Sequence, residues 1–582
     1  MVDVSNDNIA ENLLAIIPEN LKLHQMWDNG KKKILFVMHD NCVGGVELHV
    51  KDMIDGLCAN YNCFLLYKEE QSLLLTVYTA NDTGNFIFHL TEDCTHMLFT
   101  VPEYKKVIRD ILIGFNIDLV HVHHTLGHTL DVFYEAFRLN IPVVITLHDF
   151  YYLCPTINLL DIDLNYCKGV LDDERCSNCL NMKLGKIEKT LREWRNEIQQ
   201  ILIGVSKIFV PNKTVKEIYC EYYQGIDAKI SVIEHGIALE KSGYKPRADK
   251  KEYFNIAFIG NVFPHKGSNI IYDLITHNAE SDIRWHIFGW TGGDAKLSQL
   301  SRNDLHKHGS YDRNKLVDLL CANNIHLICI LSIWPETYCY TLTESICAGI
   351  PVLVSDLGAL GDRVQDSGTG WIVKYNSSAD QILAVIKKIK DDLNKYNYYI
   401  ETVSKYNIKS VNEMCYEYHT EYEALLNNRV VNRYESEFDA EAILLANRDI
   451  KHYLITQKKN IREMFESLRE NESLTRQPIG IYIFGTGQGG QVLVEHIREC
   501  DYYDNIKGFF DNNSTKWGTS FLSIPVLEPK EDVIRRQDIV IIASQNYAAQ
   551  MRRQLIKMGI PRDKIIYPGE LLRCLLKDIK QV

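Results

Sequence analysis

Two glutamates near the middle of the chain stand where they could bind a phosphorylated sugar. Glu336 and Glu344 are eight positions apart, after an apolar run at 325–334 and before a stretch with helical spacing. A loop that leads into a helix presents free backbone N–H groups and the positive end of the helix dipole, and both favour a phosphate. One carboxylate beside that phosphate can accept hydrogen bonds from sugar hydroxyls, and the other from a ribose. A pair of surface glutamates is the alternative interpretation.

Four cysteines form a second candidate site. Cys154, Cys167, Cys176 and Cys179 fall within 26 residues, although the whole chain has only 16 cysteines. The Cys176-x2-Cys179 spacing is that of half a zinc knuckle, and two further thiols complete a tetrahedral set. Four thiolates leave no open coordination position, so the spacing predicts a structural zinc rather than a catalytic one. Reduced thiols and disulfides are the alternatives.

A histidine-rich segment coincides with the end of the apolar run at 118–123. It contains His121, His123, His124 and His128. Histidines can bind a metal, but metal sites usually add carboxylates or thiols in a fixed geometry. A strand end that lines a ligand-binding crevice explains His121 and His123 more simply, so we favour that interpretation.

A glycine-rich turn begins the last hundred residues. Gly485, Gly487 and Gly490 form a G-x-G-x-x-G pattern between an apolar run and a helical pattern, the context in which this motif binds nucleotide phosphates. Asp511 ends the next apolar run, 21 residues beyond Gly490, where a ribose-binding acid belongs. The segment lacks the Tyr-x3-Lys pair of a sugar dehydratase or epimerase. It therefore predicts binding of a nucleotide or nucleotide-sugar rather than redox chemistry.

The elements that position these residues are visible as apolar runs alternating with helical patterns. The first set of runs spans 32–38, 62–67, 118–123, 142–148, 207–211 and 229–234. After a polar stretch at 241–251 the runs recur at 254–260, 284–289, 326–331 and 351–355. Strands and helices in alternation predict an α/β protein with open parallel sheets covered on both faces. Ligands bind such sheets at the carboxyl ends of the strands.

The same alternation predicts where the domains begin and end. We expect a helical extension at 1–30, a first α/β domain at 31–238 with a cysteine-rich insertion at 150–182, a second α/β domain at 239–410, a helical connector at 411–477 and a small Rossmann-like domain at 478–582. Two doubly wound domains facing a cleft would bring the ends of their strands together.

Composition excludes several classes of protein. The chain has 582 residues with 64 basic and 76 acidic side chains, and its net charge of −12 argues against a nucleic-acid binder. No apolar run approaches the roughly 18 residues that span a bilayer. Residues 1–33 hold acids and amides before any apolar stretch, unlike a signal peptide. We therefore expect a cytoplasmic protein with reduced cysteines.

The segment around the two glutamates resembles the E-x7-E region of retaining glycosyltransferases of family 4, which have the GT-B fold. The resemblance covers roughly residues 31–420 and rests on landmarks in the family's order. They are Gly44-Gly45, His121-Val122-His123, Thr146-Leu147-His148-Asp149, Val232–Gly236, Ile259-Gly260-Asn261 with Lys266-Gly267, Trp334–Pro351 and Pro351–Gly358.

The resemblance implies roles for individual residues. Glu336 would contact hydroxyls of the donor sugar, Lys266 would neutralise the leaving diphosphate and His148 would lie near the anomeric carbon. The implied donor-binding set is Gly44, Gly45, Gly260, Asn261, His265, Lys266, Cys339, Tyr340, Thr341 and Glu344. The family requires no catalytic metal, and the donor is a nucleotide-sugar.

One position departs from the family pattern. Family members often carry an arginine after the glycine that opens the second domain, where this chain has Asn261. One fixed positive charge is therefore missing. Stabilisation of the leaving group is expected to rest on Lys266 with support from His265 or another group.

Taken together, the motifs predict a retaining, metal-independent transferase that moves a sugar from a nucleotide-sugar to a glycan or lipid-linked glycan during surface polysaccharide synthesis. A basic run at 181–198 could contact the inner face of a membrane, although a solvated helix face is the commoner meaning of such a run. Two other functions are open. One is a nucleotide-sugar-sensing regulatory or scaffolding protein with an inactive transferase body. The other is a nicotinamide-dependent oxidoreductase centred on the C-terminal domain.

Overall fold

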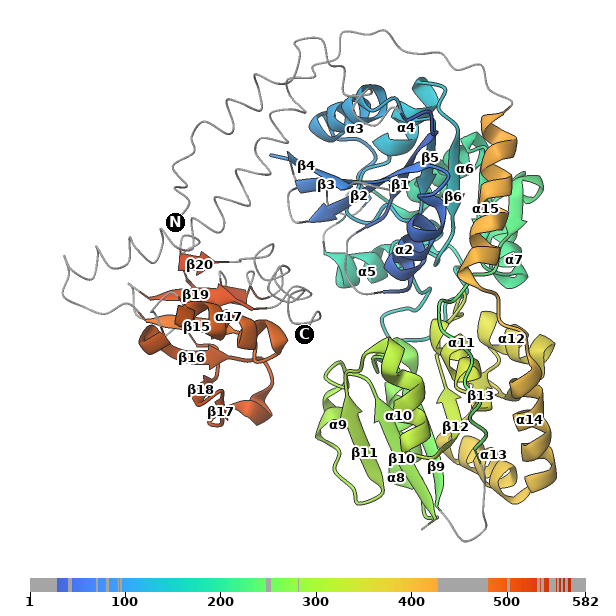
Figure 1. The fold of residues 1–582 in the computed structure, drawn as a ribbon, viewed down its shortest axis with the longest axis vertical. Coiled ribbons are helices and arrows are strands. Elements are labelled where there is room, and N and C mark those ends of the chain that lie inside the picture. The colour runs from blue at the N-terminus through green and yellow to red at the C-terminus, as the bar shows by residue number, and fades with distance from the viewer. Residues whose placement is uncertain are drawn as a thin grey trace. The chain divides into compact units, whose positions relative to one another are not determined.

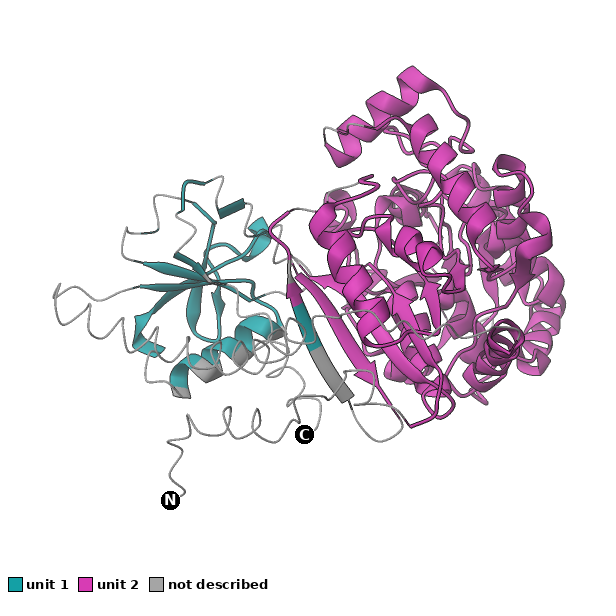
Figure 2. Ribbon diagram, turned by 90° about the horizontal axis from the view of Figure 1, so that it is seen from above, with its two compact units in different colours: residues 1–18, 85–87, 440–582 teal, residues 19–84, 88–439 magenta. Residues whose placement is uncertain are grey.

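The computed structural model describes most of the chain, and Figure 1 shows its elements. The described residues are 29–39, 44–69, 72–79, 83–92, 94, 97–185, 187, 189–246, 253–280, 282–427, 480–499, 503–530, 534, 538–543, 551, 554–555, 558–560 and 564–566. Residues 1–28 of the extension expected at 1–30, and most of the predicted connector, from 428 onwards, lie outside these ranges. The chain divides into a larger unit, 19–84 with 88–439, and a smaller unit, 1–18 with 85–87 and 440–582 (Figure 2).

The first sheet of the larger unit has eight strands in the order β4-β3-β2-β1-β5-β6-β7-β8. Its strands are β1 Lys33–Val37, β2 Asn62–Glu69, β3 Ser72–Tyr78, β4 Thr83–His89, β5 Leu119–Val122, β6 Val143–Thr146, β7 Lys207–Val210 and β8 Ile230–Val232. Its helices are α2 Gly45–Leu57, α3 Pro102–Gly114, α4 Asp131–Arg138, α5 Asp173–Leu184, α6 Leu191–Gly204 and α7 Lys213–Tyr222. The central strand β1 is buried at every position and pairs in parallel with β2 and β5, as its continuous apolar sequence predicts.

The edge of this sheet departs from the parallel pattern. Strand β3 pairs antiparallel with β2, and its residues alternate between buried and partly exposed. This alternation is the burial pattern of a strand with one face against the core and one towards water. The first sheet is therefore mixed, with its parallel part centred on β1.

The second sheet is parallel throughout, in the order β11-β10-β9-β12-β13-β14. Its strands are β9 Phe254–Ile259, β10 Ile283–Phe288, β11 Leu305–Gly309, β12 Ile325–Ile330, β13 Val352–Ser355 and β14 Gly370–Val373. The helices around it are α8 Ser268–His277, α9 Ala295–Gln299, α10 Leu316–Ala322, α11 Tyr340–Cys347, α12 Ala359–Ser367, α13 Ala379–Asp391 and α14 Leu393–Lys405, with 3-10 turns η3 Pro264–Lys266 and η4 Arg313–Lys315. Separate apolar cores form on its two faces. The prediction of two doubly wound α/β domains is confirmed.

Helix α15, Val411–Leu426, begins inside the segment predicted to be a connector, but it packs against the first domain. Met414, Tyr418 and Tyr422 are fully buried in the core that also contains α2 and β1 residues. The Tyr61 hydroxyl donates a hydrogen bond of 2.9 Å to Glu423. The spacing of these apolar side chains along one helix face explains the burial. Residues 411–426 therefore belong to the first domain rather than to a connector.

The smaller unit contains a third sheet in the order β17-β18-β16-β15-β19-β20. Its described elements are β15 Ile481–Phe484, α17 Gln488–Glu499, β16 Ile506–Phe510, β17 Ser520–Phe521, β18 Ile524–Leu527, β19 Ile539–Ile542 and β20 Ile565–Ile566. Strand β15 is central and pairs in parallel with β16 and β19, as the predicted Rossmann-like pattern requires. Among the residues described in both units, no helix is long and apolar enough to span a membrane.

Candidate functional site

Lys266 and Glu336 form an ion pair at the carboxyl ends of two adjacent strands. Lys266 follows β9 in η3, Glu336 follows β12, and β9 and β12 pair directly. Lys266 Nζ lies 2.5 Å from Glu336 Oε1, which also accepts hydrogen bonds from Ser332 at 2.6 Å and Trp334 at 3.1 Å. Burial alone would lower the pKa of Lys266, but the Glu336 carboxylate outweighs it and holds that pKa above its usual value. Lys266 is therefore a permanent cation beside a carboxylate that is 5% exposed.

Backbone contacts hold both residues of this pair in place. Gly267 has a φ of +84°, and a Cβ added there would lie 2.2 Å from the carbonyl oxygen of Leu331. Gly358 has a φ of +63°, and its added Cβ would lie 2.5 Å from the carbonyl oxygen of Glu336. Only glycine fits such close approaches in the left-handed region. The two loops are thus fixed against the ends of β12 and α12.

A second ion pair, between Arg313 and Glu344, lies at helix α11. Arg313 Nε is 2.5 Å from Glu344 Oε1, and the guanidinium lies over the Tyr340 ring at 5.2 Å from its centroid. The Nη2 atom of Arg313 is buried and has no hydrogen-bond partner among the described residues. Sequence analysis missed Arg313, which stands in η4 beyond β11 and belongs to no motif. This guanidinium is the second fixed cation of the site.

The start of α11 lies among these charges. Its N-cap residue, Cys339, has a φ of +69° and makes no side-chain capping bond. A Cβ added to Gly260, at the end of β9, would lie 3.2 Å from the Thr341 side chain, so this strand end abuts the helix start. Such a terminus offers backbone donors and a positive dipole end to an anion. The sequence predicts that a diphosphate binds at Cys339, Tyr340 and Thr341, and these three residues form the start of α11.

Two other residues of the predicted donor set have different surroundings. The Asn261 side chain accepts a hydrogen bond of 3.2 Å from the backbone N–H of Trp290. Burial and the neighbouring Lys266 lower the pKa of His265 to about 4. His265 is therefore neutral near pH 7 and does not supply the positive charge that an arginine at position 261 would carry. Arg313 does carry a positive charge.

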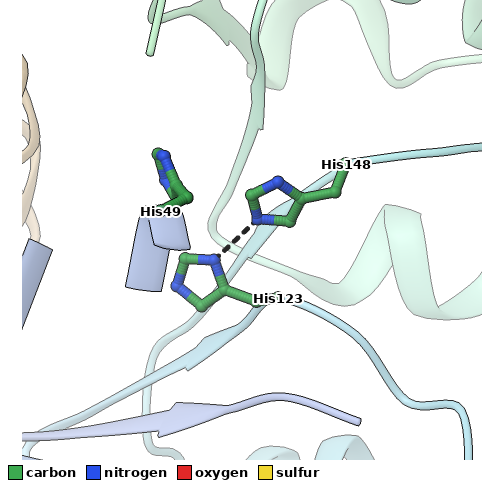
Figure 3. A group of neighbouring side chains, drawn as sticks. All are labelled: His49, His123 and His148. Carbon is green, nitrogen blue, oxygen red and sulfur yellow. Dashed lines mark hydrogen bonds between the residues drawn. The ribbon is translucent and has the colours of Figure 1, made fainter. Parts of the chain in front are cut away.

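Histidines from the first domain form the other part of the site (Figure 3). His49 from α2, His123 after β5 and His148 after β6 each place one ring nitrogen within 4.8 Å of the others, the one such metal-competent group among the described residues. His123 Nδ1 and His148 Nε2 share a hydrogen bond of 2.9 Å. The His235 ring lies 4.0 Å from that of His49.

These imidazoles are neutral near pH 7. Burial is the main cause that lowers the pKa values of His49, His123, His148 and His235, and their neighbouring imidazoles lower them further. Buried nitrogens of His49, His123 and His235 have no hydrogen-bond partner within the described structure. Unpaired buried nitrogens of neutral imidazoles suit sugar hydroxyls, which can donate and accept. They also suit a metal by type, but the His123–His148 hydrogen bond occupies one nitrogen of each ring.

The remaining histidines of the histidine-rich segment have structural partners. His121 bonds to Tyr422 at 2.5 Å and to Thr146 at 2.7 Å. His124 bonds to Asp149 at 3.2 Å, and His128 bonds to Tyr104 and to the Met38 carbonyl, both at 2.7 Å. Of the four, His123 alone joins the group with unpaired nitrogens.

Contacts between the two domains of the larger unit bring the two parts of the site together. The Thr337 hydroxyl donates to the His148 carbonyl, and the Tyr338 hydroxyl donates to the His235 carbonyl at 2.7 Å. A Cβ added to Gly45 would lie 3.6 Å from the Tyr340 ring, so the start of α2 faces the start of α11. Gly44, the N-cap residue of α2, is extended. The segment 334–344 is therefore fixed beside the histidines.

The glycine-rich turn of the smaller unit has the close backbone packing that its motif predicts, but the carboxylate of Asp511 already has partners within the protein. A Cβ added to Gly490 would lie 2.4 Å from the Gly485 carbonyl, and Gly487 has open space around it. Asp511 pairs with Lys516 at 2.9 Å and accepts hydrogen bonds from Thr486 and the Asn513 N–H. A ribose at Asp511 would have to displace Lys516 or share the carboxylate with it.

Basic residues near α5 and α6 are largely bonded within the protein. Lys183 donates to the Leu160 carbonyl at 2.7 Å, Arg192 pairs with Asp173 at 2.9 Å, and Arg195 donates to the Leu153 carbonyl at 2.8 Å. The run at 181–198 is also divided between two helices. These bonds favour a solvated protein surface over a cationic membrane face.

Two family models match consecutive parts of the larger unit. The model described as Glycosyltransferase Family 4 matches residues 43–241, and the model described as Glycosyl transferases group 1 matches 244–406. A third, described as C2185-like, N-terminal, matches 480–566 in the smaller unit.

Relatives of known name are distant in sequence. The chain is 24% identical over 212 residues to the lipopolysaccharide 1,2-N-acetylglucosaminetransferase of Salmonella typhimurium, which covers 33% of this chain and 55% of that protein. An uncharacterized 41.2 kDa protein in the cps region of Klebsiella pneumoniae is 23% identical over 32% of this chain and 54% of its own. The chain thus spans about half the length of these two relatives. The phosphatidyl-myo-inositol mannosyltransferase of Mycobacterium leprae is 23% identical over 61% of this chain and 86% of its own.

Solved structures with similar architecture include HepE from Anabaena in complex with UDP, with a TM-score of 0.46 and 14% identity over 67% of this chain and all of that one. A glycosyltransferase from Rickettsia africae has a TM-score of 0.47 and 17% identity over 69% of this chain and all of that one. The two matched family models follow the order of the two doubly wound domains and meet between their sheets. Over residues 43–406 the chain belongs to the family 4 type of glycosyltransferases with the GT-B fold.

Proposed function

We propose that the larger unit transfers a sugar from a nucleotide-sugar to a glycan acceptor, with retention of configuration and without a catalytic metal. The observation that carries the proposal is the pair of cations, Lys266 and Arg313, beside the uncapped start of α11. Two fixed positive charges and free N–H groups suit a diphosphate better than any neutral ligand. The names of the Salmonella and Mycobacterium relatives, both sugar transferases, support the same reaction class.

In this proposal the bond from the anomeric carbon to the donor's diphosphate breaks, and negative charge grows on the departing phosphate oxygen. Lys266 and an Arg313 N–H stabilise that charge as it develops, which lowers the barrier more than equal binding of substrate would. The acceptor oxygen attacks the same face of the sugar. Its proton passes to an oxygen of the departing phosphate, so no protein base is needed.

The other side chains orient the sugar and the nucleotide. Glu336 accepts hydrogen bonds from sugar hydroxyls, and Glu344 accepts them from the ribose. The neutral imidazoles of His123 and His148 face the sugar, where they can bond to hydroxyls without placing a positive charge beside the developing oxocarbenium character. The acceptor is a glycan or a lipid-linked glycan of a surface polysaccharide, the setting that the Salmonella relative's name describes.

The test is release of nucleoside diphosphate from a panel of nucleotide-sugars, with and without oligosaccharide acceptors. Lys266→Met should lower turnover by about 10²- to 10³-fold, the usual loss when one preorganised electrostatic group is removed. Lys388→Met, at an exposed position of α13, is the matched control and should leave turnover unchanged. Tight nucleotide-sugar binding without release by the wild-type protein would instead indicate a sensing protein with an inactive transferase body.

A further inference from the structure

The segment that follows His148 is irregular and strained. Between β6 and α5 it forms only an isolated bridge, Leu160 to Tyr166. Non-glycine residues occupy the left-handed region at Ile157 (φ +74°), Leu159 (φ +55°), Leu164 (φ +64°) and Lys168 (φ +54°). A β-branched residue such as Ile157 rarely adopts this conformation, and strain of this kind persists only where surrounding structure enforces it. Surrounding structure must therefore hold the segment, and part of it is the apolar core in which Leu153, Leu159 and Leu160 are buried.

Four cysteines of this segment and of α5 line one pocket. Cys154 and Cys167 come from the irregular part, whereas Cys176 and Cys179 come from one turn of α5. The i, i+3 spacing places the last two on the same helix face. The CxxC half of the cysteine-rich insertion predicted at 150–182 thus lies on a helix. Other residues lining the pocket are Thr156, Leu160, Asp161, Gly169, Val170, Arg175, Leu180, Leu191 and Arg195.

The thiols are not paired as disulfides. All the cysteines of this pocket are free, and three of the thiols make only weak hydrogen bonds. Cys167 donates to the Leu159 carbonyl at 3.1 Å, Cys176 donates to the Val170 carbonyl at 3.7 Å, and Cys154 lies 3.3 Å from the Thr156 hydroxyl.

We propose that Cys154, Cys167, Cys176 and Cys179 bind one structural Zn²⁺ ion. The four sulfurs line one pocket but do not make a preformed group of the kind that the three histidines make, so the metal would draw them together into the tetrahedral, closed coordination of structural zinc, in which each thiol binds as a thiolate and releases its proton. Such a centre carries two negative charges. Arg195 lines the same pocket and its positive charge would oppose that of the centre, whereas Arg175 is already paired with Asp161 at 2.7 Å.

The zinc would stabilise the backbone that carries His148. Arg195 donates to the Leu153 and Gly169 carbonyls, at 2.8 and 2.7 Å, and so ties the two ends of the irregular segment to α6. Tyr219 donates to the Asp149 carbonyl at 2.7 Å, immediately after His148. The metal would thus act on the transfer site only through the position of this loop.

Elemental analysis of the full-length chain, purified in reductant without chelator, tests the proposal. We expect one zinc per chain, protection of the four thiols from alkylation, and alkylation of all four after a strong chelator removes the metal. Cys176→Ser with Cys179→Ser should abolish zinc binding. Cys220→Ser, on α7 and outside the pocket, is the matched control and should retain it.

The wild-type protein alone decides the question if the double variant fails to fold. Replacement of zinc by Co²⁺ should give the visible and near-ultraviolet absorption of tetrahedral cobalt bound to four thiolates. Wild-type protein with no stoichiometric metal and four alkylatable thiols would overturn the proposal. Stoichiometric iron, or a disulfide between any two of these cysteines in the reduced preparation, would overturn it as well.

Discussion

Arg313 offers the sharpest test of the donor site, because no sequence motif points to it. In Arg313→Met the guanidinium is lost but the aliphatic volume is largely kept. The partner Glu344 is 6% exposed and Arg313 is 24% exposed, and the pair is joined at 2.5 Å. Removing one partner of a fully buried pair costs about 3–5 kcal/mol. Because Arg313 retains some contact with water, we expect Arg313→Met to lower the free energy of unfolding by about 2–3 kcal/mol.

Binding should weaken by a separate amount. The unpartnered Nη2 of Arg313 is available for a charge-assisted hydrogen bond to the nucleotide diphosphate, worth about 1.5–3 kcal/mol. This corresponds to a roughly 10- to 100-fold increase in the Kd. Glu344→Gln should also weaken binding, and the double variant should lose less than the sum, since both groups act through one ion pair. We expect a coupling energy of about 1–2 kcal/mol.

Calorimetric titration with UDP, GDP and ADP measures these affinities, using whichever diphosphate the wild-type protein binds. Arg302→Met is the matched control, since Arg302 forms a bidentate pair with Asp304 at 2.8 Å in the same domain but outside the site. It should bind nucleotide as the wild type does. Affinity of Arg313→Met within about twofold of the wild type, or strict additivity with Glu344→Gln, would refute the role assigned to Arg313.

Three further outcomes are expected. Glu336→Gln should lower turnover by about 10²-fold or more, measured by initial rates, while the affinity for nucleoside diphosphate, measured by calorimetry, stays near that of the wild type. A parallel loss of turnover and affinity would instead indicate that Glu336 contacts the diphosphate. Gly267→Ala should lower the melting temperature because its Cβ meets the Leu331 carbonyl at 2.2 Å, whereas Gly243→Ala, with open space around it, should not; equal melting temperatures would contradict the geometry. The free energy of unfolding should fall as pH drops below about 6.5. Burial lowers the pKa values of His121 and His128 to about 3, so in this pH range the unfolded chain binds more protons than the folded one. Each histidine should lower the free energy of unfolding by about 1.4 kcal/mol per pH unit. Melting temperatures at pH 7.5 and 5.5 check this dependence, and His128→Gln should reduce the slope.

The central parallel strands were predictable because each is a local, continuous apolar run. Strands β1, β5 and β9 fall within one or two residues of the runs that predict them. Strand β3, next to the edge, was missed because its sequence SLLLTVY does not alternate, although the burial of its residues does. The position of α15 could not be read from the sequence, because its charged face looks solvated and only contacts with α2 show that its aromatic face is buried.

In the candidate site, too, contacts between ends of paired strands were predictable, whereas contacts made through loops were not. Lys266 and Glu336 are 70 residues apart, yet their meeting could be expected because each follows one of two neighbouring strands. His123 and His148 meet for the same reason, since β5 and β6 pair. Arg313 follows β11, at the edge of the sheet, and reaches α11 only through the path of η4. The path of a loop depends on tertiary contacts, so spacing in the sequence could not reveal it.

On the proposed function, the charge balance of the site would let an acidic chain hold an anionic donor. Before a donor binds, Lys266 is offset by Glu336 and Arg313 by Glu344, while His265 is neutral near pH 7. On the proposed function, a diphosphate would bind beside Lys266 and Arg313, while sugar and ribose hydroxyls would donate hydrogen bonds to the two carboxylates. The overall charge of −12 is irrelevant at this distance, since charges beyond about 8–10 Å are largely screened in physiological salt. On the proposed function, two ion pairs and one helix start would set the affinity for a donor. Exchanging Asn261 for arginine would then strengthen nucleotide binding only if the new guanidinium reached the same diphosphate as Arg313.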